Sequence, residues 1–436
     1  MKSATSSGAA IRLCFATPQF YPTYGGSHQR YLRYLPGFSA SGLDVKVFTG
    51  TATDEKVTRG NVATEWKSYS IGSVLPPEMI NGIPVFRLRL PTSKGPRRRW
   101  VFSQGLDRFC HDPATRPDVV QLLGTIRVGA IPWVKRLQSL GIPTLYSLTT
   151  ASKIVRKKRF LDTRLIKFRA LFSTMDAVVT NSASVGDALK DMGVNTRIEV
   201  IPNGVDVQRF RPAPSPEIRR SVRAQLEIGA ETQVVIAVGA VTARKGSDLL
   251  LDAFLRVARD NPHAHLVFVG PRYDLAQAEK LDFRDRMAKL LCDPIAADRV
   301  HFLGIVDDVP RYLQAADLCV LASKLEGMPN SVLEAMGCAI PVLITPFTGI
   351  SKDLGRPNRE FLMCEWSPNA LANAMASLLD DPTARSFFGS AGRRWVEERL
   401  PLDLSIKRHV ELYEELVTAY RTRYSVEMRG LSEILQ

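Results

Sequence analysis

Patterns typical of buried strands and of amphipathic helices alternate along most of this 436-residue chain, in two successive sets. In the first half, strand-length apolar runs lie at 11–16, 44–49, 84–90, 119–123, 143–148, 177–182 and 197–201, and helical patterns include 27–40, 127–140 and 152–173. In the second half, the runs lie at 233–238, 265–269, 299–303, 318–323 and 341–345. Alternation at this spacing predicts βαβ units and therefore parallel sheets.

The two sets of elements predict two doubly wound, Rossmann-like α/β domains that face each other across a cleft. A chain of this length is expected to form two or three domains with ample core. The stretch 209–216, Arg-Phe-Arg-Pro-Ala-Pro-Ser-Pro, is rich in proline and is predicted to link the domains. We therefore expect a first domain at 1–205, a second at 206–403, and a helix with a tail at 404–436. Helical patterns at 368–380, 383–398 and 404–422 close the chain.

Positive charge is concentrated in the first half of the chain. Residues 1–205 contain 29 Lys and Arg against 13 Asp and Glu, a net charge of +16, whereas residues 206–436 contain 29 against 31, a net charge of −2. The asymmetry predicts that the two domains have different partners.

Other features of the composition predict a cytoplasmic protein. No apolar run approaches the ~20 residues of a membrane-spanning helix, and the first ten residues lack the apolar core of a secretory signal. The six cysteines are scattered without a Cys-x-x-Cys pair, and several lie in apolar runs. They are expected to be reduced core residues.

The most specific local pattern is Glu326-Gly-Met-Pro-Asn-Ser-Val-Leu-Glu334, which continues as Ala-Met-Gly-Cys-Ala-Ile-Pro-Val. It follows the apolar run 318–323 and precedes a helical pattern that Asn330 or Ser331 would cap. Glu326 is thus predicted in the loop at the carboxyl end of a strand, and Glu334 in the first helical turn. Open α/β sheets bind ligands at such loops, where unpaired helix N–H groups can face a phosphate. The alternative is a capping box, in which Ser331 and Glu334 only close the helix start.

The full string resembles the signature of retaining nucleotide-sugar glycosyltransferases of the family 4 type, which have the GT-B fold. The resemblance extends over residues 11–422, nearly the whole chain. It implies that Glu326 contacts the hydroxyl groups of the donor sugar and that Glu334 binds the nucleotide ribose. It also implies that the last helix crosses back to the first domain. The intervening residues implied to bind the donor are Met328, Pro329, Asn330, Ser331 and Val332.

Three further loops match places where this family approaches the donor. Gly25-Gly26 follows the first strand, and paired glycines let the backbone come close to a phosphate. Gly239 follows the first strand of the second domain, and Lys245 in the same loop is implied to neutralise the diphosphate. Ile305 falls where the family's backbone contacts the base.

The sequence departs from the family pattern at three places. Most members have an arginine at the position of Ala240, and Arg244 is the neighbouring candidate for that charge. A histidine near the donor sugar is replaced here by Thr149-Thr150, which are expected on the acceptor side. The glycine usually found before Pro-Val is Ala339, so the turn there is predicted to differ.

The chemistry that the resemblance implies needs no enzyme nucleophile. The departing diphosphate takes the proton of the acceptor hydroxyl on the same face of the sugar, while the protein aligns the substrates and stabilises the leaving phosphate. Lys245, Arg244 and Glu326 are the candidate catalytic residues. Because the chain has no Asp-x-Asp pair and no histidine cluster, no metal and no other cofactor is expected.

The basic first domain is expected to handle the acceptor. Basic residues gather at 94–100 and at 152–173, where eight Lys and Arg face one acid, Asp162. A basic amphipathic helix predicts an anionic membrane surface as a partner. The alternative is a helix packed on the domain with a solvated basic face. Nucleic acid is not an expected partner, since no recognition motif accompanies the charge.

These observations predict a metal-independent enzyme that moves a hexose-type sugar from a nucleotide-sugar donor to a glycolipid or polysaccharide acceptor, in the cytoplasm or peripherally at the inner face of the membrane. One alternative is a catalytically weak member that binds a nucleotide sugar, suggested by Ala240 and Thr149. Another is a different GT-B enzyme, an epimerase or a phosphorylase, although no pyridoxal-phosphate lysine site is recognisable. A non-enzymatic membrane or nucleic-acid binder would explain the charge but not the donor motifs.

Overall fold

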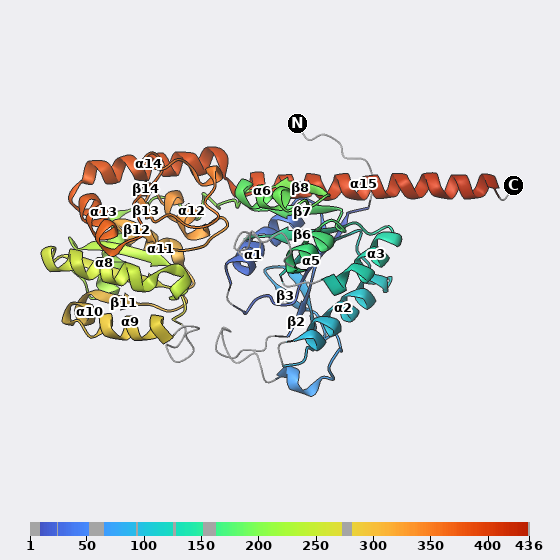
Figure 1. Ribbon diagram of the computed structural model, residues 1–436, viewed down its shortest axis with the longest axis horizontal. Coiled ribbons are helices and arrows are strands. Elements are labelled where there is room, and N and C mark those ends of the chain that lie inside the picture. Colours follow the sequence, from blue (N-terminus) through green and yellow to red (C-terminus); the bar gives the residue numbers. More distant parts are fainter. Residues whose placement is uncertain are drawn as a thin grey trace. The chain divides into compact units, whose positions relative to one another are not determined.

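The protein forms two compact α/β units (Figure 1) in a computed structural model that describes residues 9–23, 25–51, 65–92, 95–124, 128–150, 163–272 and 281–434. Unit 1 consists of the described chain up to Ile201 together with the residues from Asp403 onward. Unit 2 is continuous and runs from Pro202 to Leu402. The chain therefore leaves unit 1 after Ile201 and returns to it after Leu402, against sequence-based expectations of 205 and 403.

Unit 1 contains a sheet with the strand order β3-β4-β2-β1-β5-β6-β7-β8 among its described residues. Its strands pair in parallel except for β3, which is antiparallel to β4. The strands are β1 (Arg12–Thr17), β2 (Asp44–Gly50), β3 (Glu78–Ile80), β4 (Ile83–Leu88), β5 (Val119–Leu123), β6 (Thr144–Leu148), β7 (Ala177–Thr180) and β8 (Arg197–Val200). The helices are α1 (Gly26–Ala40), η2 (Glu65–Ser68), α2 (Pro96–His111), η3 (Val128–Ala130), α3 (Ile131–Ser139), α5 (Thr163–Phe172), α6 (Ala183–Asp191) and α15 (Leu402–Ile434).

Unit 2 contains a second, parallel sheet with the order β11-β10-β9-β12-β13-β14. Its strands are β9 (Gln233–Val238), β10 (Ala264–Val269), β11 (Val300–Phe302), β12 (Leu318–Leu321), β13 (Val342–Ile344) and β14 (Leu362–Met363). Its helices are α7 (Pro216–Gln225), η4 (Ala243–Lys245), α8 (Ser247–Asp260), α9 (Leu281–Leu291), α10 (Pro294–Arg299), α11 (Val309–Ala315), α12 (Asn330–Gly337), η6 (Lys352–Leu354), α13 (Pro368–Asp380) and α14 (Pro382–Arg399).

The period-two geometry of a strand explains why the sheet of unit 2 is covered on both faces. Val235 and Leu266 lie in one apolar core with α8 and α13, whereas the adjacent Ile236 and Val267 lie in another with α11, α12 and α14. Successive side chains of a strand point to opposite faces, so a continuous apolar run requires helices on both sides. This confirms the predicted doubly wound architecture.

The predicted proline-rich linker is wrong, because the segment belongs to the core of unit 2. Phe210 is fully buried in the apolar core beside α12. Its carbonyl oxygen accepts a hydrogen bond from Arg393 Nη1 at 2.6 Å, and Arg393 also reaches the carbonyl oxygen of Val207. The prolines that follow only lead into α7, which has Pro216 in its first turn.

Helix α15 belongs to unit 1 and is fixed there by a buried polar network. The Tyr413 hydroxyl donates to Gln121 Oε1 on β5. Gln121 Nε2 in turn donates to the hydroxyls of Tyr31 on α1, at 2.7 Å, and Ser147 on β6, at 2.5 Å. Around this network the ring of His409 packs against Tyr34 and neighbouring aromatic side chains. Figure 1 shows α15 continuing past the sheet that it covers.

We expect Tyr413→Phe to destabilise the protein by about 1–3 kcal/mol, because it leaves the buried Gln121 Oε1 without its donor. Urea unfolding monitored by circular dichroism measures the loss. Tyr69→Phe serves as the matched control, because Tyr69 is exposed and a surface change of this kind stays within about 0.5 kcal/mol. Equal unfolding midpoints for the two variants would contradict the assigned role of the network.

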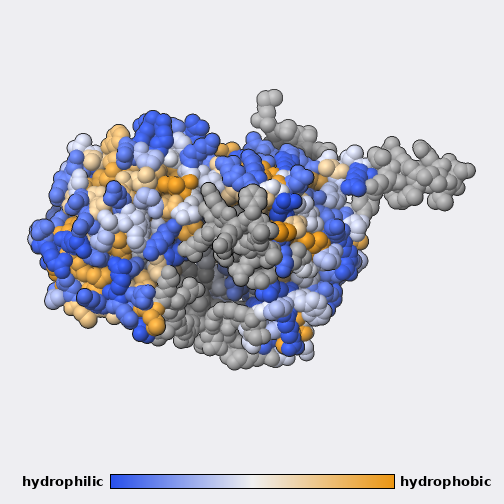
Figure 2. Space-filling model, in the orientation of Figure 1, coloured by the Kyte–Doolittle hydropathy of each residue, from blue (hydrophilic) through white to orange (hydrophobic). Residues whose placement is uncertain are grey.

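Surface features add little to the fold. No helix in the described part of the chain is long and apolar enough to cross a membrane. Hydrophilic residues predominate on the face shown in Figure 2, with apolar residues scattered in small groups. Of the six cysteines, which are all free, Cys292 is exposed and Cys364 half-buried, whereas the other four are buried as expected.

Candidate functional site

The topology of unit 2 places two loops side by side. The strand order reverses between β9 and β12, since the chain runs outward from β9 through β10 to β11 and then returns to β12. Crevices for ligands form at the carboxyl ends of strands at such a switch point. The loop after β9 contains Gly239 and Lys245, and the loop after β12 contains Glu326.

Glu326 is the centre of the contacts between these loops. Its Oε1 atom lies 2.8 Å from Lys245 Nζ and 2.8 Å from Arg244 Nη1. The hydroxyl of Ser323 donates to the same oxygen at 2.7 Å. Lys245, Arg244 and Ser323 thus converge on one carboxylate oxygen of Glu326. Ser323 was not singled out from the sequence, because a serine ending an apolar run carries no distinctive signal.

The two cations decide the ionisation of Glu326. Burial by itself raises the pKa of this carboxyl group, but the charges of Lys245 and Arg244 outweigh burial, so the pKa is lowered. The side chain of Lys245 is itself only 17% exposed. The site therefore holds an ionised, largely shielded carboxylate whose side chain is 12% exposed, paired with two cations that could instead bind an anion.

Hydrogen bonds to backbone carbonyl groups hold the two loops together. Lys324 N–H donates to the Arg244 carbonyl at 2.9 Å, and Arg244 Nη1 donates to the Leu325 carbonyl at 2.8 Å. Gly246 has φ +65°, and its Cα lies so close to Ala322 that an added Cβ would overlap the Ala322 carbonyl oxygen. Glycine is required there for both reasons, conformation and space. Gly246 thus sets the position of the adjacent Lys245.

The helix after Glu326 does not begin with a capping box. Helix α12 starts at Asn330, with Pro329 at the N-cap and no side-chain cap bond. Ser331 is therefore the second helical residue and Glu334 the fifth, two positions beyond the third residue that would close a capping box. Glu334 is 5% exposed. The capping interpretation is therefore wrong.

Val332 and Asn203 fix the start of α12 within unit 2. The side chain of Val332 is fully buried in the apolar core, and its N–H donates to the Pro329 carbonyl at 3.1 Å. Asn203, near the start of unit 2, is buried and donates from Nδ2 to the Met328 carbonyl at 3.0 Å and to Asn330 Oδ1 at 2.7 Å. Asn203 therefore holds the start of α12 in place.

The turn after α12 has the geometry of a glycine turn despite Ala339. This alanine has φ +57°, and Ile340 N–H donates to the Ala335 carbonyl at 3.0 Å, as in a Schellman ending. The predicted difference in turn geometry is wrong, because the hydrogen bonds impose the left-handed conformation on the alanine. An L-residue bears about 1–2 kcal/mol of strain there.

The remaining sequence-predicted residues lie at other loops. Gly25 is the N-cap of α1 and Gly26 its first residue, and both follow β1 at the carboxyl edge of unit 1. Thr149 and Thr150 directly follow β6 and are half-buried. Ile305 follows β11 in unit 2 and is half-buried. The basic stretch at 152–173 is described only as α5 from Thr163 to Phe172, and the rest lies outside the described residues.

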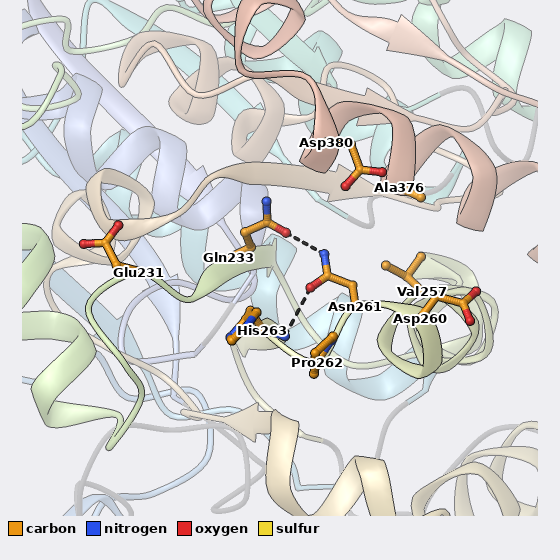
Figure 3. Close-up of a pocket in the computed structure, with 9 residues that line it drawn as sticks. All are labelled: Glu231, Gln233, Val257, Asp260, Asn261, Pro262, His263, Ala376 and Asp380. Carbon is orange, nitrogen blue, oxygen red and sulfur yellow. Dashed lines mark hydrogen bonds between the residues drawn. The ribbon is translucent and has the colours of Figure 1, made fainter.

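A cavity of about 460 Å³ lies elsewhere in unit 2 (Figure 3). It is at the amino ends of β9 and β10, the opposite edge from Glu326. Its amide groups are bonded to one another, since Asn261 Nδ2 donates to Gln233 Oε1 at 2.6 Å and His263 N–H donates to Asn261 Oδ1 at 3.1 Å. Ligands of open α/β sheets bind instead at the carboxyl ends of the strands. No group of three or more His, Cys, Asp and Glu side chains suited to a metal ion occurs among the residues that the structure describes.

Comparison with known proteins connects this geometry to a family. D-inositol 3-phosphate glycosyltransferase of Salinispora tropica is 24% identical over 419 residues, covering 88% of this chain and 83% of that protein. Mannosylfructose-phosphate synthase of Agrobacterium fabrum is 33% identical over 187 residues, covering 41% of this chain and 40% of that protein. Both relatives are similar to this chain in sequence.

Solved structures agree on the fold. Sucrose-phosphate synthase from Thermosynechococcus elongatus has a TM-score of 0.73 and 21% identity, covering 94% of this chain and 100% of that one. HepE of Anabaena in complex with UDP-glucose has a TM-score of 0.69 and 19% identity, covering 93% of this chain and 99% of that one. These likenesses show the GT-B fold.

Family models match both units. Residues 25–204 match the glycosyl transferase 4-like domain, and residues 232–381 match glycosyl transferases group 1. The matched residues include Gly25 and Gly26 in unit 1 and the loops of Lys245 and Glu326 in unit 2. The chain belongs to the group 1 glycosyltransferases of the family 4 type, and it is a glycosyltransferase of the GT-B fold.

Proposed function

We propose that this glycosyltransferase moves a hexose-type sugar from a nucleotide-sugar donor to a glycolipid or polysaccharide acceptor, with retention of configuration and without a metal ion. The observation that carries the proposal is the convergence of Lys245, Arg244 and Ser323 on Glu326 at the switch point of unit 2. A buried carboxylate suits sugar hydroxyls, and adjacent cations suit a diphosphate. A nucleotide sugar carries its sugar directly on a diphosphate, so a site for it needs the carboxylate and the cations side by side.

Each residue has a distinct role in the proposed reaction. The bond from the anomeric carbon to the diphosphate oxygen breaks as the acceptor oxygen bonds to the same face of the sugar. The diphosphate oxygen takes the acceptor's proton. Lys245 stabilises the negative charge that grows on the leaving phosphate, Glu326 orients the sugar through its hydroxyls, and Glu334 binds the ribose. Donor binding would draw Lys245 from Glu326 toward the diphosphate.

Similar proteins support this choice of substrates. One relative, 31% identical over 215 residues, is named a GDP-mannose-dependent mannosyltransferase acting on an acylated phosphatidylinositol monomannoside. HepE was solved with UDP and with UDP-glucose. The basic residues of unit 1 suit an acceptor at an anionic membrane surface, where each Lys or Arg adds about 1 kcal/mol. Ile166, Lys167 and Arg169 on α5 are exposed.

The two glutamates give a test that separates donor binding from transfer. We expect Glu334→Ala to weaken the affinity for a nucleoside diphosphate by about tenfold, the cost of one hydrogen bond to a buried charged group. Glu326→Ala is expected to leave that affinity unchanged while reducing sugar transfer. Isothermal titration with UDP and GDP, together with a transfer assay from the matching nucleotide sugars, measures both effects.

Contrary results are easily recognised. If both variants bind the nucleotide like the wild type and are only less stable to heat, neither glutamate contacts the donor. A wild-type protein that binds nucleotide sugars but transfers none to any acceptor tested would support the catalytically weak alternative, which Ala240 suggests. Arg244, the neighbouring candidate for that charge, donates to Glu326 and to the Leu325 carbonyl.

A further inference from the structure

Glu326 is held from both sides, because β12 lies between β9 and β13 in the sheet of unit 2. The loop after β9 contacts its carboxylate through Lys245 and Arg244. The loop after β13, residues 345–350, contacts its backbone. This second loop has no charged side chain and lies outside the motif that contains Glu326. Its role is therefore visible only in the folded chain.

The loop after β13 continues the pairing of β12 with β13 beyond the ends of both strands. Leu325 lies opposite Thr348 in the register that the two strands already have. Thr348 N–H donates to the Lys324 carbonyl at 3.0 Å, and Glu326 N–H donates to the Thr348 carbonyl at 3.2 Å. The main chain at Glu326 is therefore hydrogen-bonded to this loop.

Gly349 brings the same loop into direct contact with Glu326. An added Cβ at Gly349 would overlap the Glu326 carbonyl oxygen and lie 3.3 Å from its carbonyl carbon. Because these are main-chain atoms, no rotation of a side chain relieves the overlap. The φ of Gly349 is +101°, which also disfavours any residue with a Cβ. A substitution at this position must therefore move the backbone of Glu326 or of the loop.

The loop around Gly349 is anchored in the apolar core of unit 2. Phe347 is 6% exposed and belongs to the core cluster that contains Val332 of α12. Ile350 N–H donates to the Phe347 carbonyl at 3.3 Å, which closes a four-residue turn with Gly349 as its third residue. A positive φ at the third residue is what a type II turn requires. Since Phe347 holds the loop, an atom added at Gly349 is expected to displace Glu326.

We propose that the loop after β13 is a positioning element for sugar transfer, in which Gly349 sets the place of the Glu326 carboxylate against the donor sugar. This assignment rests on the proposed function, in which Glu326 orients the sugar through its hydroxyls. In that reaction the donor draws Lys245 away from Glu326, so one support of the carboxylate is lost as the sugar arrives. The main-chain contacts with the loop remain and keep the carboxylate in place.

Gly349→Ala tests the assignment through the sugar. We expect it to weaken the affinity for UDP-glucose or GDP-mannose by about tenfold or more, because hydrogen bonds from the sugar to a charged group are lost. Release of the diphosphate from the same donor should slow about 100-fold, the scale for a misplacement of about 1 Å. The affinity for UDP or GDP should change less than about twofold, since Glu326 contacts only the sugar. Isothermal titration and initial rates measure these effects.

Gly42→Ala is the matched control. Gly42 has φ +94°, close to that of Gly349, but it lies in unit 1 and an added Cβ would meet no atom within 4 Å. The control therefore carries the conformational strain without the overlap and should bind both ligands like the wild type. A purely structural Gly349 would reduce the fraction of protein that binds, equally for the nucleotide and the nucleotide sugar, and would leave the ratio of the two affinities unchanged.

A double-mutant cycle shows whether Gly349 acts through Glu326. Glu326→Ala removes the carboxylate, so adding Gly349→Ala should then change the affinity for the nucleotide sugar by less than about twofold. If Gly349→Ala has its full effect in both backgrounds, it acts independently of Glu326 and the assignment is wrong. Should Gly349→Ala not fold, Thr348→Pro replaces it in the cycle, because proline lacks the N–H that donates to the Lys324 carbonyl.

The same titrations separate this inference from the proposed function. If the wild type binds neither nucleotide sugar, or if Glu326→Ala binds both like the wild type, the proposed contact of Glu326 with the donor sugar is refuted, and the positioning role with it. If Glu326→Ala loses affinity for the nucleotide sugar whereas the loop variant behaves like Gly42→Ala, the loop is not a positioning element and the donor site stands.

Discussion

Replacing Lys245 by alanine is expected to lower kcat/KM for sugar transfer by about 2–4 kcal/mol of transition-state stabilisation, roughly 30- to 1000-fold. Lys245 Nζ lies 2.8 Å from Glu326 and is largely buried. In the proposed reaction this ammonium group neutralises the phosphate oxygen that leaves the sugar. An electrostatic group in such a sheltered position is worth far more than one in water.

Initial-rate kinetics with a nucleotide sugar measure the effect of Lys245→Ala. Lys324→Ala is the matched control, because Lys324 is an exposed neighbour that lies over the ring of Trp366. Transfer should persist in EDTA for the wild type. Full activity of Lys245→Ala, or loss of wild-type activity in EDTA with recovery in Mn²⁺, would show that the leaving group is stabilised by other means.

The same variant should shift the pH dependence of its residual activity. Lys245 is the strongest of the cations that lower the pKa of Glu326, so this pKa should rise when the lysine is removed. Because the sugar is oriented by the ionised carboxylate, activity is lost as the pH falls through the raised pKa. The acidic limb of the rate profile should therefore lie at higher pH in the variant than in the wild type.

Gly246→Ala is expected to destabilise unit 2 by about 3–5 kcal/mol, among the largest effects of a single substitution. The left-handed conformation alone costs a non-glycine residue about 1–2 kcal/mol. The added Cβ would also overlap the Ala322 carbonyl oxygen. Relief of that overlap must separate the loop of Lys245 from the loop of Glu326, so sugar transfer should fall as well.

Gly304→Ala isolates the contribution of the overlap. Gly304 has φ +66°, close to that of Gly246, but an added Cβ would meet no atom within 4 Å. Urea unfolding should show only the conformational cost of about 1–2 kcal/mol for this control. If the two variants are equally stable, the close approach of Gly246 to Ala322 contributes nothing to the stability of unit 2.

Local pattern predicted most of the fold because the buried strands are continuous apolar runs. The strands at 119–123 and 233–238 have the predicted bounds. Helix α2 was not predicted, because its first residues form a basic cluster in the sequence. The burial of Arg98 in this helix is visible only in the structure. The short strands β3 and β14 were also missed, since strands of two or three residues carry too little periodicity.

The residues of the candidate site were predictable where a sequence motif contains them. They were not predictable where a residue acts through a contact that only the folded chain creates. Lys245 and Glu326 could be named from the sequence, although they are 81 positions apart, because the family signature carries them. The contacts of Asn203 with Met328 and Asn330 depend on a long-range approach that no local pattern encodes.

The return of α15 to unit 1 determines the order in which the newly made chain can be completed. Unit 2 is a continuous segment, whereas unit 1 lacks its last helix until Tyr413 has been synthesised. At 5–20 residues per second, the roughly 200 residues of unit 2 take about 10–40 s to make. During this interval the face of the first sheet that α15 covers has no partner. The first half of the chain thus belongs to the part of the protein whose fold is completed last.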